Sequence, residues 1–314
     1  MRMKKSVSIA VFITISFTFF HCGTSIPFTS TPILDPALAD TLRSFASRVR
    51  GEVGIYVRNL RTGQTAAVNA DTLFPTASLI KVPIMVGLFD RIEKGGLKYQ
   101  DELVYRDSMS YSNEDMLGVF KDSTKIPVSQ LVMLSLTMSD NTASLWCQAL
   151  AGGGAAINEV LEANGFHKTR VNSRTPGREA IREVYGWGHT TPREMAELVV
   201  AIRQGRLISP IASERMYRNL CRTYWDGEAL AQIPPDVHIA SKQGMVNKSR
   251  SEVVLVNAPS GDYVFCVITK NQEDESWTHE NEGYVLRRNV SRFLWKYFEP
   301  GRPWSPLQGT EKWY

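Results

Sequence analysis

The sequence is poor in cysteine, and no cysteines or histidines stand at the spacing of a metal site. Its four cysteines are Cys22, Cys147, Cys221 and Cys266, too few for a disulfide-rich scaffold. Cys147 falls in an expected helix and Cys266 in an expected strand, both among apolar residues, which favours buried free thiols. If Cys22 is cleaved away or lipidated, the other three can form at most one disulfide. No motif implies a cofactor.

Long runs of lysine and arginine are also missing. The net charge is only +4 over 314 residues, so no nucleic-acid partner is expected. The hydrophobic content of 43% is that of an ordinary globular protein, long enough for one large domain or two small ones. We find no internal repeat and no strong sign of an oligomer, so we expect a monomer.

The N-terminus has the pattern of a signal peptide, which we assign to residues 1–22. Residues 1–5 are basic and residues 7–20 almost wholly apolar, a stretch too short to span a membrane comfortably. Cys22 follows at once, as a lipid-attachment cysteine would, although His21 stands where a small residue is expected before cleavage. We therefore expect export, to the periplasm or to a lipid anchor at the cell envelope through Cys22. Residues 23–36 resemble a tether.

Strand patterns occur at both ends of the chain, with helical patterns between them. We expect an α+β fold, in which one antiparallel sheet takes strands from both chain ends and an all-helical subdomain is inserted at about 78–205. The catalytic domain would span 37–300 and a tail 301–314. The expected strands are 51–57, 65–69, 237–244, 252–257 and 263–270, and the flanking helices are 35–50 and 281–298.

Ser78 and Lys81 begin an apolar run that is typical of a buried helix. Residues three apart share a helix face, so the hydroxyl and the amine would lie side by side. A serine needs a neighbouring base to act as a nucleophile, and a lysine in an apolar wall can lose its proton and serve as that base. The pattern alone is weak, since Ser-x-x-Lys occurs about once by chance in a chain of this size.

Two further short motifs each allow a structural and a functional interpretation. Ser139-Asp140-Asn141 precedes an expected helix, so Ser139 or Asp140 could simply cap it, or Ser139 could carry a proton while Asn141 orients Lys81 and a substrate amide. Lys242-Gln243-Gly244 lies on an expected strand, where the lysine is either a solvated edge residue or a cation that faces a ligand beside bare backbone.

Taken together in this order, Ser-x-x-Lys, Ser-Asp-Asn and Lys-x-Gly are the signature set of penicillin-recognising serine enzymes. From Asp35 to Phe298 the chain resembles the class A β-lactamase family. The resemblance implies that Ser78 is acylated, that Lys81 is its base or proton relay, and that Ser139 passes a proton to the leaving nitrogen.

The same resemblance implies the substrate-binding residues. Asn141 would hold an amide of the substrate, and Lys242 with Gly244 would face its carboxylate. The backbone N–H groups of Ser78 and Met245 would form the oxyanion hole. Tyr111 would be the aromatic wall of the cleft, and Arg250 a candidate second anchor for the carboxylate.

The sequence departs from the family pattern at three places. Gln243 replaces the hydroxyl residue of Lys-Thr-Gly. Thr175 stands where the family has the ω-loop glutamate that activates the deacylating water. The Arg–Asp pair that closes this loop falls on Ser173 and Gly188. Glu179 lies four residues beyond Thr175 and would reach the same water if this part of the loop is helical, or would only pair with nearby arginines.

The leading hypothesis is an exported serine hydrolase that opens β-lactam amides through an acyl-enzyme at Ser78. A D-alanyl-D-alanine peptidase or esterase would use the same acylation machinery on a cell-wall peptide. A slowly deacylating penicillin-binding receptor is the third hypothesis, because loss of a general base typically slows a reaction by about 10²–10⁴.

Overall fold

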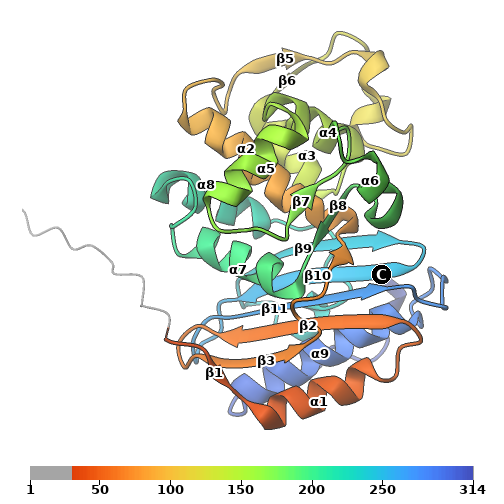
Figure 1. Cartoon of the computed structure of the whole chain (residues 1–314). Coiled ribbons are helices and arrows are strands. Elements are labelled where there is room, and N and C mark those ends of the chain that lie inside the picture. Colours follow the sequence, from red (N-terminus) through yellow and green to blue (C-terminus); the bar gives the residue numbers. More distant parts are fainter. Residues whose placement is uncertain (1–29, 314) are drawn as a thin grey trace, which may run out of the picture.

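The computed structural model describes residues 30–313, and its main sheet contains strands from both ends of this stretch (Figure 1). The order is β1-β3-β2-β11-β10-β9, antiparallel except for the β1–β3 pair. The predicted α+β fold is confirmed. The expected signal peptide and Cys22 lie outside the described residues. The strands are β1 (Ile33–Leu34), β2 (Glu52–Asn59), β3 (Gln64–Val68), β9 (Ile239–Val246), β10 (Ser249–Val256) and β11 (Tyr263–Lys270).

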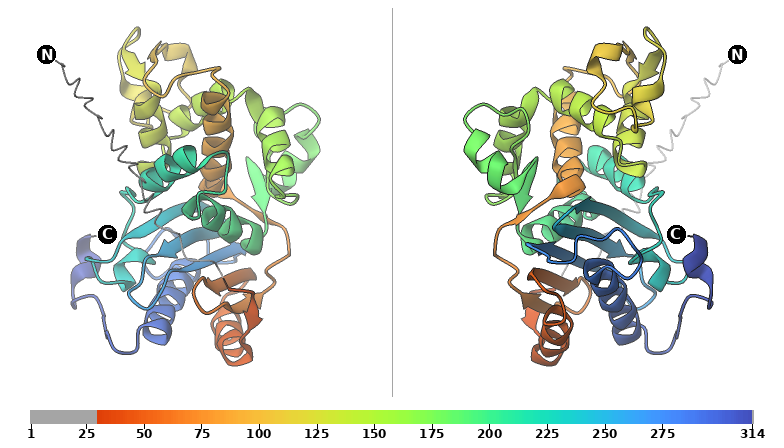
Figure 2. Two further views of the ribbon diagram at one scale, coloured as in Figure 1. Left: turned by 90° about the vertical axis from the view of Figure 1, so that its left-hand side faces the viewer. Right: turned by 90° about the vertical axis from the view of Figure 1, so that its right-hand side faces the viewer.

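The two chain ends meet where β2 pairs with β11. Helices cover both faces of the sheet (Figures 1 and 2). Side chains that point to either face are therefore buried, and β11 is almost continuously hydrophobic. One face packs on α1 (Pro36–Ala46) and α9 (Glu282–Phe298), where Leu42 and Leu294 are fully buried. Each such leucine contributes about 1.5–3 kcal/mol through burial.

The other face of the sheet carries α7 (Pro192–Arg203), which joins it to the helical layer above. This helix is capped by Thr191, whose hydroxyl accepts a hydrogen bond from the backbone N–H of Glu194 at 3.1 Å. The layer contains α2 (Lys81–Glu93), α3 (Val128–Thr137), α4 (Asn141–Leu150), α5 (Gly153–Ala163), α6 (Glu179–Tyr185) and α8 (Pro210–Leu220).

Helix α2 is the centre of the helical layer, and every residue from Lys81 to Phe89 is buried. Its close crossing with α5 depends on Gly87, because a Cβ there would lie 2.6 Å from Cγ1 of Ile157. The turn that carries Ser78 is therefore attached to a helix packed on all sides, which fixes its position relative to the sheet.

The inserted segment is less purely helical than the sequence indicates. Strands β7 (Arg170–Val171) and β8 (Gly188–Thr190) pair with each other, and β8 also pairs with β4 (Phe74–Pro75). A separate pair is β5 (Glu102–Val104) with β6 (Lys125–Pro127). Strands of two or three residues are too short to show a hydrophobic period. The β4–β8–β7 sheet fixes both ends of the 172–187 loop beside the turn that carries Ser78.

The two segments predicted to flank the domain also contact it. Residues 33–34, at the end of the predicted tether, form β1 and pair with β3. In the tail, the carbonyl of Arg302 accepts a hydrogen bond from Nε1 of Trp295 at 2.8 Å. Among residues 30–313, no helix combines the length and apolar character needed to cross a membrane.

Candidate active site

Ser78 lies in a single 3₁₀ turn, Ala77–Ile80, directly before α2. The turn approaches β9 so closely that a Cβ on Gly244 would lie 2.8 Å from the Ser78 nitrogen and 2.7 Å from the Thr76 oxygen. Position 244 thus requires glycine, because the backbone of the turn lies too close for any side chain. Ala77 has φ of +44°, a strained conformation for alanine next to the nucleophile. The Ser78 hydroxyl has no hydrogen-bond partner among the described residues, and Ser78 lines a cleft.

Lys81 is the first residue of α2 and is only 1% exposed. Its Nζ donates to Oδ1 of Asn141 at 2.8 Å and to the carbonyl of Ser139, and it lies 3.1 Å from the Ser139 hydroxyl. Burial lowers the pKa of Lys81 to about 7, and the carboxylates of Asp115 and Asp140 oppose that shift. A neutral amine that donates two hydrogens to carbonyl oxygens keeps its lone pair free to accept a proton.

Ser139 connects the two buried lysines. Its hydroxyl lies 2.9 Å from Nζ of Lys242, which also donates to the carbonyl and the side-chain oxygen of Gln243 at 2.8 and 3.0 Å. Burial and the nearby Lys81 lower the pKa of Lys242 well below its ordinary value, and Glu252 opposes them. A hydroxyl between two amines can accept a proton from one side and donate one to the other.

The capping interpretation of the Ser139-Asp140-Asn141 motif holds for Asp140. Its Oδ1 accepts from the N–H of Ala143 at 2.7 Å and its Oδ2 from the N–H of Leu117 at 2.9 Å. Ser139 in turn adopts φ of +61°, which directs its hydroxyl and carbonyl toward Lys81. The structural and functional interpretations are therefore compatible.

Asp115 is a site residue that was not predicted. This buried carboxylate accepts the N–H groups of Asn141 and Thr142 at 3.0 and 2.9 Å and the hydroxyl of Thr142 at 2.7 Å. It thereby fixes the first turn of α4 and the side chain that binds Lys81. A lone aspartate in a loop gives no sequence signal for this role.

Tyr111 lies on the wall of the cleft, as predicted from the resemblance. Its backbone N–H donates to the Thr142 hydroxyl at 2.9 Å, and its ring contacts Trp187 edge-on with centroids 5.1 Å apart. Tyr111 and Trp187 both line the cleft.

Thr175 and Glu179 are not arranged as the deacylation hypothesis requires. Thr175 is buried, donates to the carbonyl of Ser173 at 2.9 Å, and packs so closely on Gly154 that a Cβ there would lie 1.8 Å from its Oγ1. Helix α6 begins only at Glu179, so the two residues do not share a helix face. Glu179 is exposed, accepts from the N–H of Gly177 at 3.2 Å, and contacts no other predicted site residue in the described chain.

The 172–187 loop is closed without the family's ion pair. Gln148 donates to the Ser173 carbonyl at 2.5 Å and accepts from its hydroxyl at 2.8 Å. The Trp187 carbonyl accepts the N–H groups of Asn172 and Ser173 at 2.7 and 3.0 Å. Four neutral hydrogen bonds therefore hold the neck of the loop.

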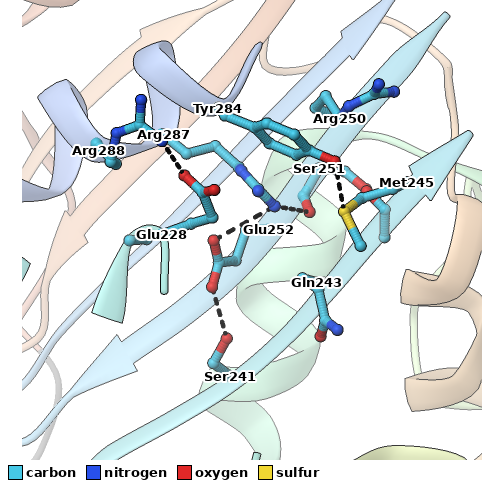
Figure 3. Close-up of polar contacts among 12 residues, drawn as sticks. Glu228, Ser241, Gln243, Met245, Arg250, Ser251, Glu252, Tyr284, Arg287 and Arg288 are labelled. Atoms are coloured by element: carbon cyan, nitrogen blue, oxygen red, sulfur yellow. Dashed lines mark hydrogen bonds and ion pairs between the residues drawn. The ribbon is translucent and has the colours of Figure 1, made fainter. Parts of the chain in front are cut away.

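The expectation that Arg250 anchors the substrate carboxylate is wrong (Figure 3). Its guanidinium is fully buried, away from the cleft, where it donates to the carbonyls of Val246, Ser249 and Ser276. The guanidinium carbon Cζ of Arg250 lies 4.4 Å from the ring centroid of Trp277 and 4.9 Å from that of Tyr284. Arg250 thus fixes the turn between β9 and β10. Strand alternation places its side chain on the face of the sheet opposite Lys242.

A buried ion pair lies on the same face of the sheet as Arg250. Arg287 of α9 is 3.5 Å from Oε2 of Glu252 and donates to the Ser251 carbonyl at 3.2 Å. Oε1 of Glu252 accepts from the Ser241 hydroxyl at 3.1 Å. Burial raises the pKa of Glu252 and the guanidinium opposes it. Glu252 is the cross-strand neighbour of Gln243, so this pair supports β9 from behind.

Met245 lies at the rim of the cleft next to Gly244. Its sulfur accepts a hydrogen bond from the Tyr284 hydroxyl at 3.1 Å (Figure 3). This contact holds the Met245 side chain against α9, and Met245 lines the cleft.

The cleft has a volume of about 540 Å³. No group of three or more His, Cys, Asp or Glu side chains within residues 30–313 is placed to hold a metal ion, and Cys147, Cys221 and Cys266 are free thiols. The lining residues are Pro75, Ala77, Ser78, Tyr111, Asn141, Val184, Tyr185, Gly186, Trp187, Met245, Val246, Lys248, Ser249, Lys270 and Asn271.

A serine on a turn, two buried lysines and the hydroxyl that links them thus lie where the helical layer meets the sheet. The family model described as "Beta-lactamase enzyme family" matches residues 37–298, and the chain belongs to that family. It is 21% identical over 259 residues to β-lactamase VEB-1 of Pseudomonas aeruginosa, covering 78% of this chain and 85% of that one.

Solved structures show the same fold. The structure of PBP-A is 27% identical with a TM-score of 0.77, covering 87% of this chain and 99% of its own. A mutant of PBP-A, solved as an acyl-enzyme complex with penicillin G, is also 27% identical, with a TM-score of 0.76 and coverage of 86% and 99%. A β-lactamase from Sphaerobacter thermophilus, at 23% identity and a TM-score of 0.75, covers 86% of this chain and all of its own.

Proposed function

We propose that this protein is a serine hydrolase that opens β-lactam amides through an acyl-enzyme at Ser78 and releases the acyl group slowly. The observation that carries the proposal is the buried Lys81, whose pKa is lowered to about 7 next to the nucleophile turn. It is supported by family membership and by the joint contacts of Lys81 and Lys242 with Ser139.

Acylation would proceed in two steps. Ser78 Oγ attacks the lactam carbonyl as its proton passes to the neutral Lys81, and the N–H groups of Ser78 and Met245 stabilise the oxyanion. The C–N bond then breaks, and the leaving nitrogen takes the Ser139 proton. The proton on Lys81 returns to Ser139 across the 3.1 Å contact. The product is an ester at Ser78, and no proton is gained or lost overall.

At the leaving-group end, Lys242 and Gln243 would bind the substrate carboxylate. Oε1 of Gln243 accepts from Lys242 at 3.0 Å, so its amide N–H₂ would be left to donate to the carboxylate in place of the family's hydroxyl.

Deacylation needs a base for the attacking water, and the position of the family's glutamate is occupied by Thr175. Thr175 donates its hydroxyl hydrogen to the Ser173 carbonyl and has no basic group. We therefore propose that deacylation is slower by the roughly 10²–10⁴ typical of general-base catalysis.

A second candidate is a penicillin-binding peptidase or receptor, which acylates and retains the ligand. The likeness to PBP-A at 27% identity favours it, because slow deacylation is what separates such a protein from a β-lactamase. A peptide substrate ending in D-alanyl-D-alanine would acylate Ser78 by the same steps.

The experiment is intact-mass spectrometry of the folded domain mixed with benzylpenicillin, with Ser78→Ala as control. An adduct of the mass of the intact penicillin supports the proposal, and its decay rate separates hydrolase from receptor. No adduct, or an equal adduct in Ser78→Ala, would refute acylation at Ser78.

We also propose that the protein is exported and reaches the cell envelope. The support is the basic and apolar N-terminal pattern followed by Cys22. Fractionation of cells that express the full chain and Cys22→Ser tests it: release of the variant alone indicates a lipid anchor, release of both a periplasmic protein, and retention of both in the cytoplasm contradicts export.

A further inference from the structure

The cleft extends past Ser78 to the end of the sheet, where three strands bring Val246, Ser249 and Lys270 together. Val246 pairs with Ser249 across β9 and β10, and Lys270 ends β11 two residues beyond the Ser251–Ile268 pair. Residues paired across strands point to the same face. All three line the cleft, so this end of the sheet forms its floor.

If Ser78 is acylated as proposed above, this end would face the acyl side of the substrate. Lys242 and Ser139 serve the leaving nitrogen, and Val246 lies four residues beyond Lys242 on β9, about 13 Å along the strand. With the scissile carbonyl near the N–H groups of Ser78 and Met245, the acyl substituent would extend toward Val246 and Ser249. This substituent is bonded to the carbonyl carbon on the side opposite the leaving nitrogen.

Ser249 has an unsatisfied polar group at this place. It is 1% exposed, and its hydroxyl is buried without a hydrogen-bond partner among the described residues. A buried hydroxyl without a partner costs about 1–3 kcal/mol. A ligand atom that accepts a hydrogen bond would remove this cost, so the hydroxyl itself points to a ligand.

The charged residues near Ser249 that line the cleft are all positive. Lys270, with its side chain 18% exposed, lies over the Phe74 ring at 5.0 Å, and Lys248 lines the same end. No Asp or Glu is among the lining residues. The acidic partners Glu52 and Glu275 lie 3.1 and 3.6 Å from the two ammonium groups and are half exposed, and such ion pairs are worth at most about 1 kcal/mol.

We propose that this end of the cleft is a subsite for a carboxylate on the acyl group of the substrate, bound by Lys270, Lys248 and the hydroxyl of Ser249. The opposite wall contributes Trp187, Tyr185 and Val184, which would cover the aliphatic part of the chain. The substrate class is then an acyl group that ends in an acid, as in a peptide fragment with a free side-chain or terminal carboxylate. The inference rests on the proposed acylation of Ser78.

The test uses matched penicillins made by acylating 6-aminopenicillanic acid. Each pair has a chain of two to four methylene groups that ends either in a carboxylate or in the carboxamide of the same shape. The second-order rate constant of acylation is measured for each by intact mass. For the best chain length we expect the acid to react about 5–20 times faster than the amide, the equivalent of one or two charge-assisted hydrogen bonds.

Variants assign the preference to the subsite. In Lys270→Met the acid-to-amide ratio should fall to within about twofold of unity, Lys270→Arg should restore it, and Ser249→Ala should lower it about threefold. Lys125→Met removes one positive charge from the exposed β5–β6 pair and should leave the ratio unchanged, which excludes a mere effect of net charge.

A ratio near one in the unmodified protein, or an unchanged ratio in Lys270→Met, would overturn the subsite. If Lys270→Met fails to fold, two other measurements test the subsite. The acid-to-amide ratio should fall in Ser249→Ala, and the preference for the acid should be lost at 0.5 M salt in the unmodified protein. Absence of any adduct with benzylpenicillin would instead overturn the proposed function, so the two failures are distinguishable.

Discussion

The most informative test of Lys81 as the proposed base is Asn141→Asp. The Asn141 oxygen lies 2.8 Å from Nζ of Lys81, so the substitution places a carboxylate beside the amine without changing its size. An opposite charge this close raises a lysine pKa by about 1–3 units. From a starting pKa of about 7, half of the Lys81 amines would then be neutral only at about pH 8–10.

The size of the effect follows from the neutral fraction. At pH 7 about half of Lys81 is neutral in the unmodified protein, and about 9% to 0.1% would be neutral in Asn141→Asp. Acylation by benzylpenicillin at pH 7 should therefore slow about 5- to 500-fold and recover as the pH rises. In the unmodified protein, the rate should fall about tenfold per unit below pH 7.

The assay is the acylation rate constant between pH 5 and pH 10 for both proteins and for Asn141→Ala. The alanine variant loses a substrate contact but adds no charge, so its rate should drop without a shift of the profile to higher pH. If Asn141→Asp lowers the rate by the same factor at every pH, Lys81 is not the titrating base and the reasoning fails.

Variants at three further positions test neighbouring assignments. Thr175→Glu should speed decay of the acyl-enzyme by about 10²–10⁴ if the new side chain turns from Gly154 toward the cleft. Thr175→Gln, which has the size of glutamate but no basic group, should not speed it. Equal decay rates in the two variants would remove the explanation for slow deacylation. Glu179→Gln should leave acylation and decay within twofold, because the side chain is exposed and remote from the site; a tenfold slower decay would restore Glu179 as the base. Arg250→Met should lower the free energy of unfolding by about 2–4 kcal/mol in urea titration, since it strands buried carbonyls, with acylation of the folded protein within threefold; a selective loss of carboxylate-bearing ligands would return it to the cleft.

Much of the fold could be predicted from the sequence because its strong signals are local. The apolar run at 263–270 matches β11 residue for residue, and the Thr-Pro-x-Glu pattern from Thr191 is typical of a helix start, as at α7. Strand β10 begins at Ser249, three residues earlier than expected. Its start was not predicted because its first four residues are polar. They are buried by tertiary contacts that no period reveals.

The site residues divide in the same way. Ser78, Lys81, Ser139, Asn141 and Lys242 carry recognisable motifs, and the structure brings them together. Arg250 has no motif, and its place on β10 fixes its side chain to the opposite face. Glu179 was inferred from helical spacing, but the helix starts there and does not include Thr175.

Some partners could not be found from sequence at all. Asp115 and Gln148 are single polar residues whose roles arise only when distant segments meet, at α4 and at the neck of the 172–187 loop. The unpartnered hydroxyl of Ser249 is visible only once burial is known.

The central claim is that Ser78 acylates readily and deacylates slowly because Thr175 replaces a base. The most direct measurement is the intact mass of the domain at seconds, minutes and hours after mixing with a small excess of benzylpenicillin. The account predicts an adduct that forms within minutes and persists for hours, and that is absent in Ser78→Ala. An adduct that forms and disappears within seconds, with steady consumption of the penicillin, would contradict it.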